Sequence, residues 1–166
     1  METQSMETQL SLGPRAGNAP CVLASDSLGG KLAVSHRILI VEDDVFVGVQ
    51  YEDALTDAGY HVVDIVPTAE EAVEASQDHK PALVIMDIRL AGPRDGVDAA
   101  VEIFKRFGIR TIFASAYSDP DTHVRAEGAQ PFAWLPKPVS PQRLLATVQA
   151  ALEDLEDGSG SPPPMS

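Results

Sequence analysis

The chain has 166 residues, of which 44% are hydrophobic and 5% aromatic, enough for one globular α/β domain with extensions. Its formal net charge of −13 argues against nucleic-acid binding, because a surface of that kind needs clustered lysine and arginine. No apolar stretch approaches the ~20 residues that cross a bilayer, and no basic start precedes an apolar core, so we expect no membrane partner and no secretory signal.

The two ends of the chain differ in composition from the middle. Residues 1–35 show no sustained hydrophobic periodicity and contain several turn-forming pairs, which predicts a flexible N-terminal extension. The single cysteine, Cys21, cannot form an internal disulfide, so we expect a reducing compartment and a cytoplasmic location. Residues 157–166 are mostly Gly, Ser and Pro, which predicts a flexible tail. The folded domain is expected over residues 36–156.

Within this domain, short apolar runs alternate with segments of helical periodicity. The runs at 38–41, 61–66, 83–86, 111–114 and 132–135 have the length and composition of strands buried on both faces. Helices are predicted over about 47–58, 68–77, 97–107 and 121–127, and from Pro141 to about residue 155. Five βα units with short loops predict a doubly wound parallel sheet, (βα)5. We favour the flavodoxin-like strand order 2-1-3-4-5, because its switch point lies beside the first and third strands.

Four of the five predicted strands lead into polar residues that are suited to one reaction site. Glu42 and Asp43 follow the first strand, Asp87 the third, Ser115 the fourth, and Lys137 comes shortly after the fifth. In parallel sheets of this kind, ligands bind outside the carboxyl ends of the strands, where all these residues are expected. Two carboxylates ~5 Å apart repel by roughly 3 kcal/mol at an effective dielectric of 20. The cluster must therefore take up protons or bind a cation, and a set of oxygen ligands suits Mg²⁺.

A metal-bound acid cluster of this kind is suited to phosphoryl transfer. One carboxylate can act as the nucleophile, and Asp87 is our choice because it faces the acid pair from the neighbouring strand. Ser115 offers a hydroxyl to a phosphoryl oxygen, and Lys137 offers a positive charge. The bond before Pro138 is a candidate cis peptide that directs Lys137 inward.

Each residue also has a simpler interpretation when it is taken alone. The acidic residues after the first strand can form a solvated turn that caps the following helix, since Asp is common at helix N-termini. Ser115 alone is more often a satisfied loop hydroxyl, and Trp134 alone is more often part of the core. The combination of the acids with Asp87 and Lys137 favours a site.

Four segments carry a resemblance to a known family: ILIVEDD (38–44), LVIMDIRL (83–90), FASAY (113–117) and LPKPV (135–139). In this order and at this spacing, they resemble the receiver domain of two-component response regulators over about residues 36–155. The resemblance implies that Asp87 is the phosphoacceptor. It also implies that Glu42, Asp43, Asp87 and the backbone carbonyl of Arg89 hold Mg²⁺, that Lys137 binds the phosphoryl group, and that Ser115 and Trp134 take the switch positions. Trp134 stands where the family more often has Tyr or Phe.

The resemblance also implies partners and a function. A histidine kinase or a histidine phosphotransfer protein donates the phosphate, and a separate downstream protein reads the result, so the chain is a regulator rather than an enzyme. Only about eleven residues follow the last predicted helix, so we expect a stand-alone response regulator without an attached output domain. One alternative is a pseudo-receiver that binds a partner without phosphate. Another is an aspartyl phosphatase, disfavoured because Arg89 stands where such enzymes have a second acid.

Two large side chains are expected beside the phosphoryl group in this fold. Arg89 lies two residues after Asp87, and Tyr117 lies two residues after Ser115. A guanidinium can stack on a phenol ring, and neither side chain has a carboxylate or amide to orient a water molecule. We therefore predict that Arg89 and Tyr117 shield the phosphoryl group and tune its hydrolysis, giving a long-lived phosphorylated state.

Overall fold

The computed structural model describes residues 36–117 and 119–158. The predicted flexible segments fall outside these ranges, apart from Asp157 and Gly158, which end the last helix. The elements, in chain order, are β1 (Arg37–Val41), α1 (Val45–Asp57), β2 (His61–Val66), α2 (Ala69–His79), β3 (Leu83–Met86), α3 (Gly96–Phe107), β4 (Arg110–Ser115), α4 (Pro120–Ala126), the 3-10 helix η1 (Glu127–Ala129), β5 (Ala133–Pro136) and α5 (Pro141–Asp157).

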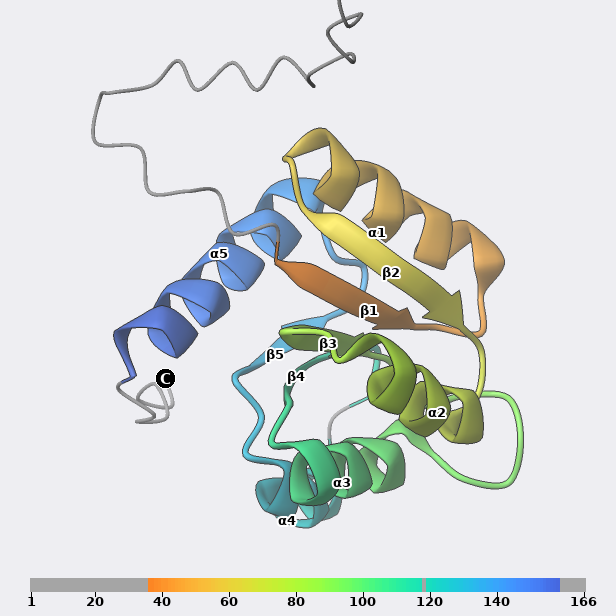
Figure 1. Ribbon diagram of the computed structural model, residues 1–166. Helices are drawn as coiled ribbons and strands as arrows, with labels where there is room; N and C mark the ends of the chain where they lie inside the picture. The colour runs from red at the N-terminus through yellow and green to blue at the C-terminus, as the bar shows by residue number, and fades with distance from the viewer. Residues whose placement is uncertain (1–35, 118, 159–166) are drawn as a thin grey trace, which may run out of the picture. The chain divides into compact units, whose positions relative to one another are not determined.

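The five strands form one parallel sheet in the order β2-β1-β3-β4-β5, which confirms the predicted fold (Figure 1). β1 lies next to the central strand β3, the chain then moves out to the edge strand β2, and it returns through β3 toward the other edge. The direction of winding therefore reverses between β1 and β3. Ligand sites in such sheets lie at this reversal, which places the candidate site above the carboxyl ends of β1 and β3.

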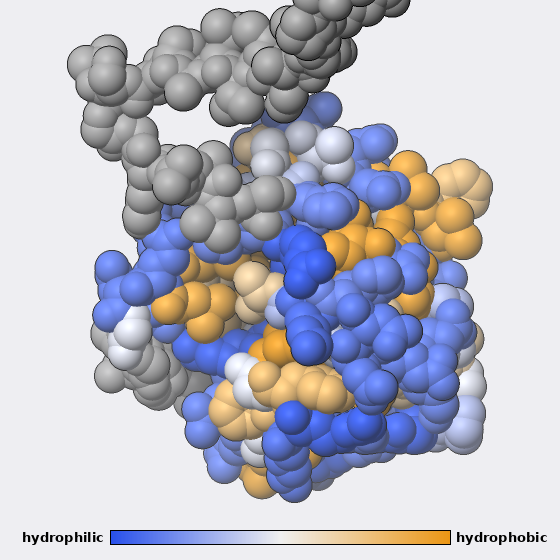
Figure 2. All heavy atoms as spheres, in the orientation of Figure 1, coloured by the Kyte–Doolittle hydropathy of each residue, from blue (hydrophilic) through white to orange (hydrophobic). Residues whose placement is uncertain are grey.

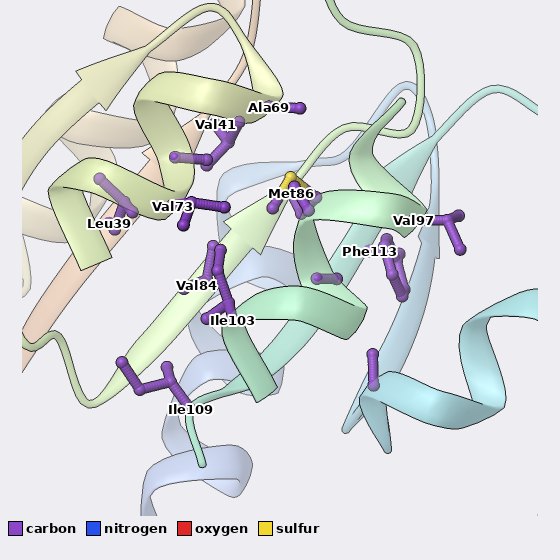
Figure 3. Packing of buried hydrophobic residues seen from close by; sticks show 14 of the residues in the cluster. Leu39, Val41, Ala69, Val73, Val84, Met86, Val97, Ile103, Ile109 and Phe113 are labelled. Carbon is purple, nitrogen blue, oxygen red and sulfur yellow. The ribbon is translucent and has the colours of Figure 1, made fainter. Parts of the chain in front are cut away.

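Both faces of the sheet are covered, because alternate residues of each strand point to opposite sides. Ile38 and Ile40 of β1 pack with residues of α1 and α5 on one face. Leu39 and Val41 pack with residues of α2 and α3 on the other, where Phe113 is also buried (Figure 3). Burial on both faces was predicted from the continuous apolar runs, and the central strands β1, β3 and β4 confirm it. The prediction was wrong for β2 and β5, which are only partly buried because they lie at the edges of the sheet.

Side-chain caps fix where the helices begin. Asp44 caps α1 by accepting a hydrogen bond from the backbone of Phe46 at 2.9 Å, and Asp95 caps α3 by accepting one from Asp98 at 3.0 Å. Such caps satisfy amide groups that have no partner within the helix. These are the helices that follow β1 and β3 in the chain, so their caps also hold the ends of the loops that carry the site residues.

The observed boundaries differ from the predicted ones by a few residues. The predicted fourth helix is observed as α4 followed by the 3-10 turn η1, which ends at Gln130 in a left-handed conformation (φ 45°). None of the helices in the described part of the chain has both the length and the apolar composition that a membrane span requires.

Candidate functional site

Two backbone hydrogen bonds fix the carboxylates at the carboxyl end of the sheet. The amide of Asp87 donates to the carbonyl of Val41 at 2.9 Å, and the amide of Glu42 donates to the carbonyl of Val66 at 2.9 Å. These bonds continue the strand ladders by one residue past β3 and β1. The side chains of Glu42 and Asp87 are therefore held on neighbouring strands by rigid backbone, as the sequence predicted.

The ammonium group of Lys137 bridges these two acids. Its Nζ lies 2.7 Å from Glu42 Oε2 and 2.7 Å from Asp87 Oδ2. The Glu42 side chain is only 2% exposed and the Lys137 side chain 19%, so the ion pairs are partly removed from solvent. Buried carboxylates need such a partner, because the cost of leaving them uncompensated is several kcal/mol. The peptide bond between Lys137 and Pro138 is cis, as predicted.

Burial and charge act in opposite directions on this pair. Burial raises the pKa of Glu42, and the hydrogen bond and charge of Lys137 offset part of that shift. Burial also acts to lower the pKa of Lys137, but its hydrogen bonds to Asp87 and Glu42 outweigh this, so the pKa of Lys137 is raised. Lys137 is therefore held firmly in its charged form between two acids.

Asp43 completes a set of three carboxylates. It is exposed, whereas Glu42 and Asp87 are buried, and one oxygen from each of the three lies within 4.8 Å of the others. Three carboxylate oxygens at one accessible point form a donor set that fits a hard cation such as Mg²⁺. The set matches the predicted metal ligands, while the role of the Arg89 carbonyl stays a prediction.

Ser115 lies beside the acids at the end of β4. It is buried, its Oγ accepts a hydrogen bond from the amide of Tyr117 at 3.2 Å, and its carbonyl accepts one from the amide of Lys137 at 3.1 Å. The second bond ties the end of β5 to the end of β4. The structure therefore joins the backbones of the two residues that carry the predicted hydroxyl and ammonium groups.

Arg89 and Tyr117 contact each other, as their positions predicted. The guanidinium carbon of Arg89 lies 3.9 Å from the centre of the Tyr117 ring, which is the geometry of a cation–π contact. The amide of Arg89 also donates to Asp87 Oδ1 at 3.3 Å. The backbone amides of the two stacked residues therefore contact the candidate acceptor, Asp87, and the candidate hydroxyl, Ser115.

Gly96 is a structural requirement that the sequence did not reveal. It is the first residue of α3, and its amide donates to the carbonyl of Ile88 at 2.8 Å. A Cβ atom at this position would overlap the backbone carbonyl of Asp87. Only glycine allows α3 to approach the candidate acceptor so closely. The close approach became visible only in three dimensions.

Trp134 is half-buried and packs between two rings rather than pointing freely outward. It stacks on Phe113 of β4 and also contacts His123 of α4. The packing interpretation of Trp134 and its predicted switch role both remain compatible with this position. His123 itself had no ligand spacing in the sequence, and its contact with Trp134 was not predicted.

A doubly wound sheet with an acid cluster, a hydroxyl and a lysine at its carboxyl edge defines the CheY-like class of receiver folds. The family model described as "Response regulator receiver domain" matches residues 38–149. This chain therefore belongs to the response regulator receiver family, and receiver domains of this family are regulatory modules.

Similar curated proteins support the same assignment. The transcriptional regulatory protein PdtaR of Mycobacterium tuberculosis is 37% identical over 120 residues, covering 72% of this chain and 58% of that protein. The phyllosphere-induced regulator PhyR of Methylorubrum extorquens is 32% identical, covering 76% of this chain and 48% of that protein. The match thus spans about half the length of these two relatives. The chemotaxis protein CheY of Bacillus subtilis is 33% identical, covering 72% of this chain and 99% of CheY.

A solved structure shows the same architecture. The crystal structure of a CheY-like response regulator receiver domain protein from Methanospirillum hungatei superimposes with a TM-score of 0.70 at 29% identity. The match covers 74% of this chain and 98% of that one. The five-stranded sheet and its covering helices are therefore shared with a domain of known structure.

Proposed function

We propose that this chain is a phosphorylated single-domain response regulator with Asp87 as its acceptor. The observation that carries the proposal is the position of Lys137 Nζ, 2.7 Å from both Asp87 and Glu42, beside the exposed carboxylate of Asp43. A partly buried ammonium pointed at an acceptor carboxylate is suited to a dianionic phosphoryl group. Support for a single-domain device comes from CheY of Bacillus subtilis, which the match covers almost completely.

In the proposed reaction, a carboxylate oxygen of Asp87 attacks the phosphorus of a phosphohistidine. The new O–P bond forms as the P–N bond to the donor imidazole breaks, and the imidazole leaves with the bonding electron pair and takes a proton from solvent. Lys137 balances the negative charge that collects on the phosphoryl oxygens. The hydroxyl of Ser115, whose oxygen accepts a hydrogen bond from the Tyr117 amide, donates its own hydrogen to one of them.

Glu42, Asp43 and Asp87 are the residues that would hold Mg²⁺. A bound Mg²⁺ ion neutralises the acid cluster and the incoming phosphoryl oxygens. The protein's own contribution is to hold Glu42 and Asp87 on adjacent strands and to leave Asp43 open to solvent. Magnesium is therefore the proposed cofactor, and phosphorylation without a divalent cation is expected to be slow.

The donor is proposed to contact the start of α1, beside the acid cluster. Val45, Phe46 and Val49 are 71%, 85% and 43% exposed, and Figure 2 shows hydrophobic atoms gathered where α1 lies in Figure 1. A donor that places a phosphohistidine against Asp87 must cover the rim of the site, and these side chains form part of that rim. The proposed donor is a histidine kinase or a histidine phosphotransfer protein, and the proposed reaction takes place in the cytoplasm.

The downstream event is proposed to be a change in binding to a separate protein. A phosphoryl group that recruits Ser115 and Lys137 alters the ends of β4 and β5, and Trp134 lies on β5. Such local changes bias a two-state element instead of creating a new fold.

The deciding experiment is incubation with acetyl phosphate and Mg²⁺, followed by intact mass measurement. We expect the wild type to gain one phosphoryl group, and no gain after chelation with EDTA or in Asp87→Asn. Asp53→Asn, an exposed acid on α1, is the matched control and should be phosphorylated like the wild type. Gain of the same mass by Asp87→Asn would overturn the acceptor assignment. Absence of any gain in the wild type would favour the constitutive binding module instead.

A further inference from the structure

Trp134 is held between two aromatic rings that come from different elements. Its ring centre lies 4.5 Å from that of Phe113, with an interplanar angle of 26°, and 3.9 Å from that of His123, with an angle of 35°. Phe113 is fully buried and pairs with Trp134 in the ladder between β4 and β5. His123 belongs to α4. One face of the indole therefore rests on the rigid sheet, and the other carries a residue of a short helix.

The second attachment of α4 leads to α3. Arg125 forms ion pairs with Asp95 at 2.8 Å and with Asp98 at 3.0 Å, both at the start of α3. Among the hydrogen bonds, ion pairs and ring contacts of residues 36–117 and 119–158, the His123–Trp134 contact is the one that joins α4 to β5. If Trp134 changes position, the imidazole must either follow it or lose its partner.

We propose that His123 is the positioning residue through which α4 follows Trp134. Displacement of the indole removes the face on which the His123 ring packs, and α4 then keeps its ion pairs with α3 and the buried side chain of Ala126 at its end. Residues next to this contact change their surroundings as a result, including Val124, which is 65% exposed on α4. The contact thus converts a movement on β5 into a change of the surface that a partner meets. The dependence on phosphate rests on the proposed function, whereas the coupling itself does not.

The first test measures this coupling without phosphate. Amide hydrogen exchange of α4 is compared among wild type, His123→Ala, Trp134→Leu and the double variant. We expect each single variant to exchange about two- to tenfold faster in α4, the range for loss of one aromatic contact. The double variant should be no faster than the single ones, because both changes remove the same interaction.

Two further variants separate coupling from general loosening. His123→Phe keeps a ring and should restore slow exchange. His61→Ala, at the start of β2 on the opposite edge of the sheet from β5, should behave like the wild type. Wild-type exchange in His123→Ala, or effects of the two single variants that simply add, would overturn the proposal.

The second test adds acetyl phosphate and Mg²⁺ and follows Trp134, the only tryptophan of the chain, by acrylamide quenching. In the wild type we expect quenching and α4 exchange to change together. In His123→Ala the quenching should still respond, while the response of α4 is lost. Equal α4 responses in both proteins would overturn the coupling. A wild type that gains no phosphoryl mass would count against the proposed function, and the phosphate-free comparison would still decide the role of His123.

Discussion

At the scale of single residues, the central feature is one lysine that serves two acids. Lys137 contacts Glu42 and Asp87 at the same distance, 2.7 Å, and both acids are buried. A phosphoryl group on Asp87 would compete for the same ammonium group. Phosphorylation is therefore expected to weaken the ion pair between Lys137 and Glu42, and a bound cation would offset this loss.

The stack of Arg89 on Tyr117 makes a prediction about the lifetime of the phosphorylated state. The guanidinium carbon of Arg89 lies 3.9 Å from the centre of the Tyr117 ring. Neither side chain can orient an attacking water molecule as a carboxylate or amide does. Replacing them in Arg89→Asn/Tyr117→Glu should speed loss of phosphate by roughly a hundredfold, the lower end of the range for general acid–base effects.

The measurement is the decay of the phosphorylated mass after acetyl phosphate is removed. Arg143→Asn, on α5, is a matched control for loss of an arginine and should decay like the wild type. A double variant that decays no faster than the wild type would show that the stack does not shield the phosphoryl group.

At the scale of elements, how much the sequence predicts depends on how local the signal is. Buried strands were predicted well, because a two-sided parallel sheet produces continuous apolar runs that are visible without knowing the partners. The candidate site followed from the same signal, since it lies where those runs end. Contacts between distant elements carried no such local signal. Arg110 pairs with Asp154 at 2.8 Å, and this pairing depends on how α5 crosses the sheet.

The ion pairs of α3 make a prediction about pH. Two hydrogen bonds, the larger effect coming from Arg94 and the smaller from Arg106, lower the pKa of Glu102 below its ordinary value of 4.5. A lowered pKa in the folded state stabilises the fold above the unfolded value, and this gain is lost as the pH falls through the folded value. Glu102→Gln should therefore reduce the free energy of unfolding at neutral pH, by no more than about 1 kcal/mol because the pairs are near the surface.

The check is urea unfolding of both proteins at neutral pH and at steps below pH 4.5. The difference between Glu102→Gln and wild type should shrink as the pH falls. Glu74→Gln, on α2, is the control for loss of an acidic side chain. A difference that stays constant with pH would show that the ion pairs do not cause it.

At the scale of the whole molecule, the acid cluster links metal binding to stability. An ion that binds only the folded chain stabilises it, by about 2.7 kcal/mol at a free concentration about 100 times its dissociation constant. Mg²⁺ should therefore raise the melting temperature of the wild type. Asp43→Ala should lose more of this rise than Glu42→Ala, because Glu42 already pairs with Lys137 whereas Asp43 is exposed.

Thermal unfolding with and without Mg²⁺ tests this ranking. Asp53→Ala, away from the cluster on the same helix as the exposed rim, should keep the full rise. Equal losses in Asp43→Ala and Glu42→Ala would contradict the ranking, and no rise in the wild type would contradict magnesium binding at the cluster.

The close approach at Gly96 has a mechanical consequence. No side chain separates the start of α3 from the backbone of Asp87. No side chain can therefore change its rotamer at this contact to absorb a small movement. Any shift of the loop after β3 reaches the helix as a rigid displacement. Asp95, the residue before Gly96, is also one of the two acids that hold Arg125 of α4. The loop after Asp87 and helix α4 are thus connected through Gly96, Asp95 and Arg125, a short path with little room for local adjustment.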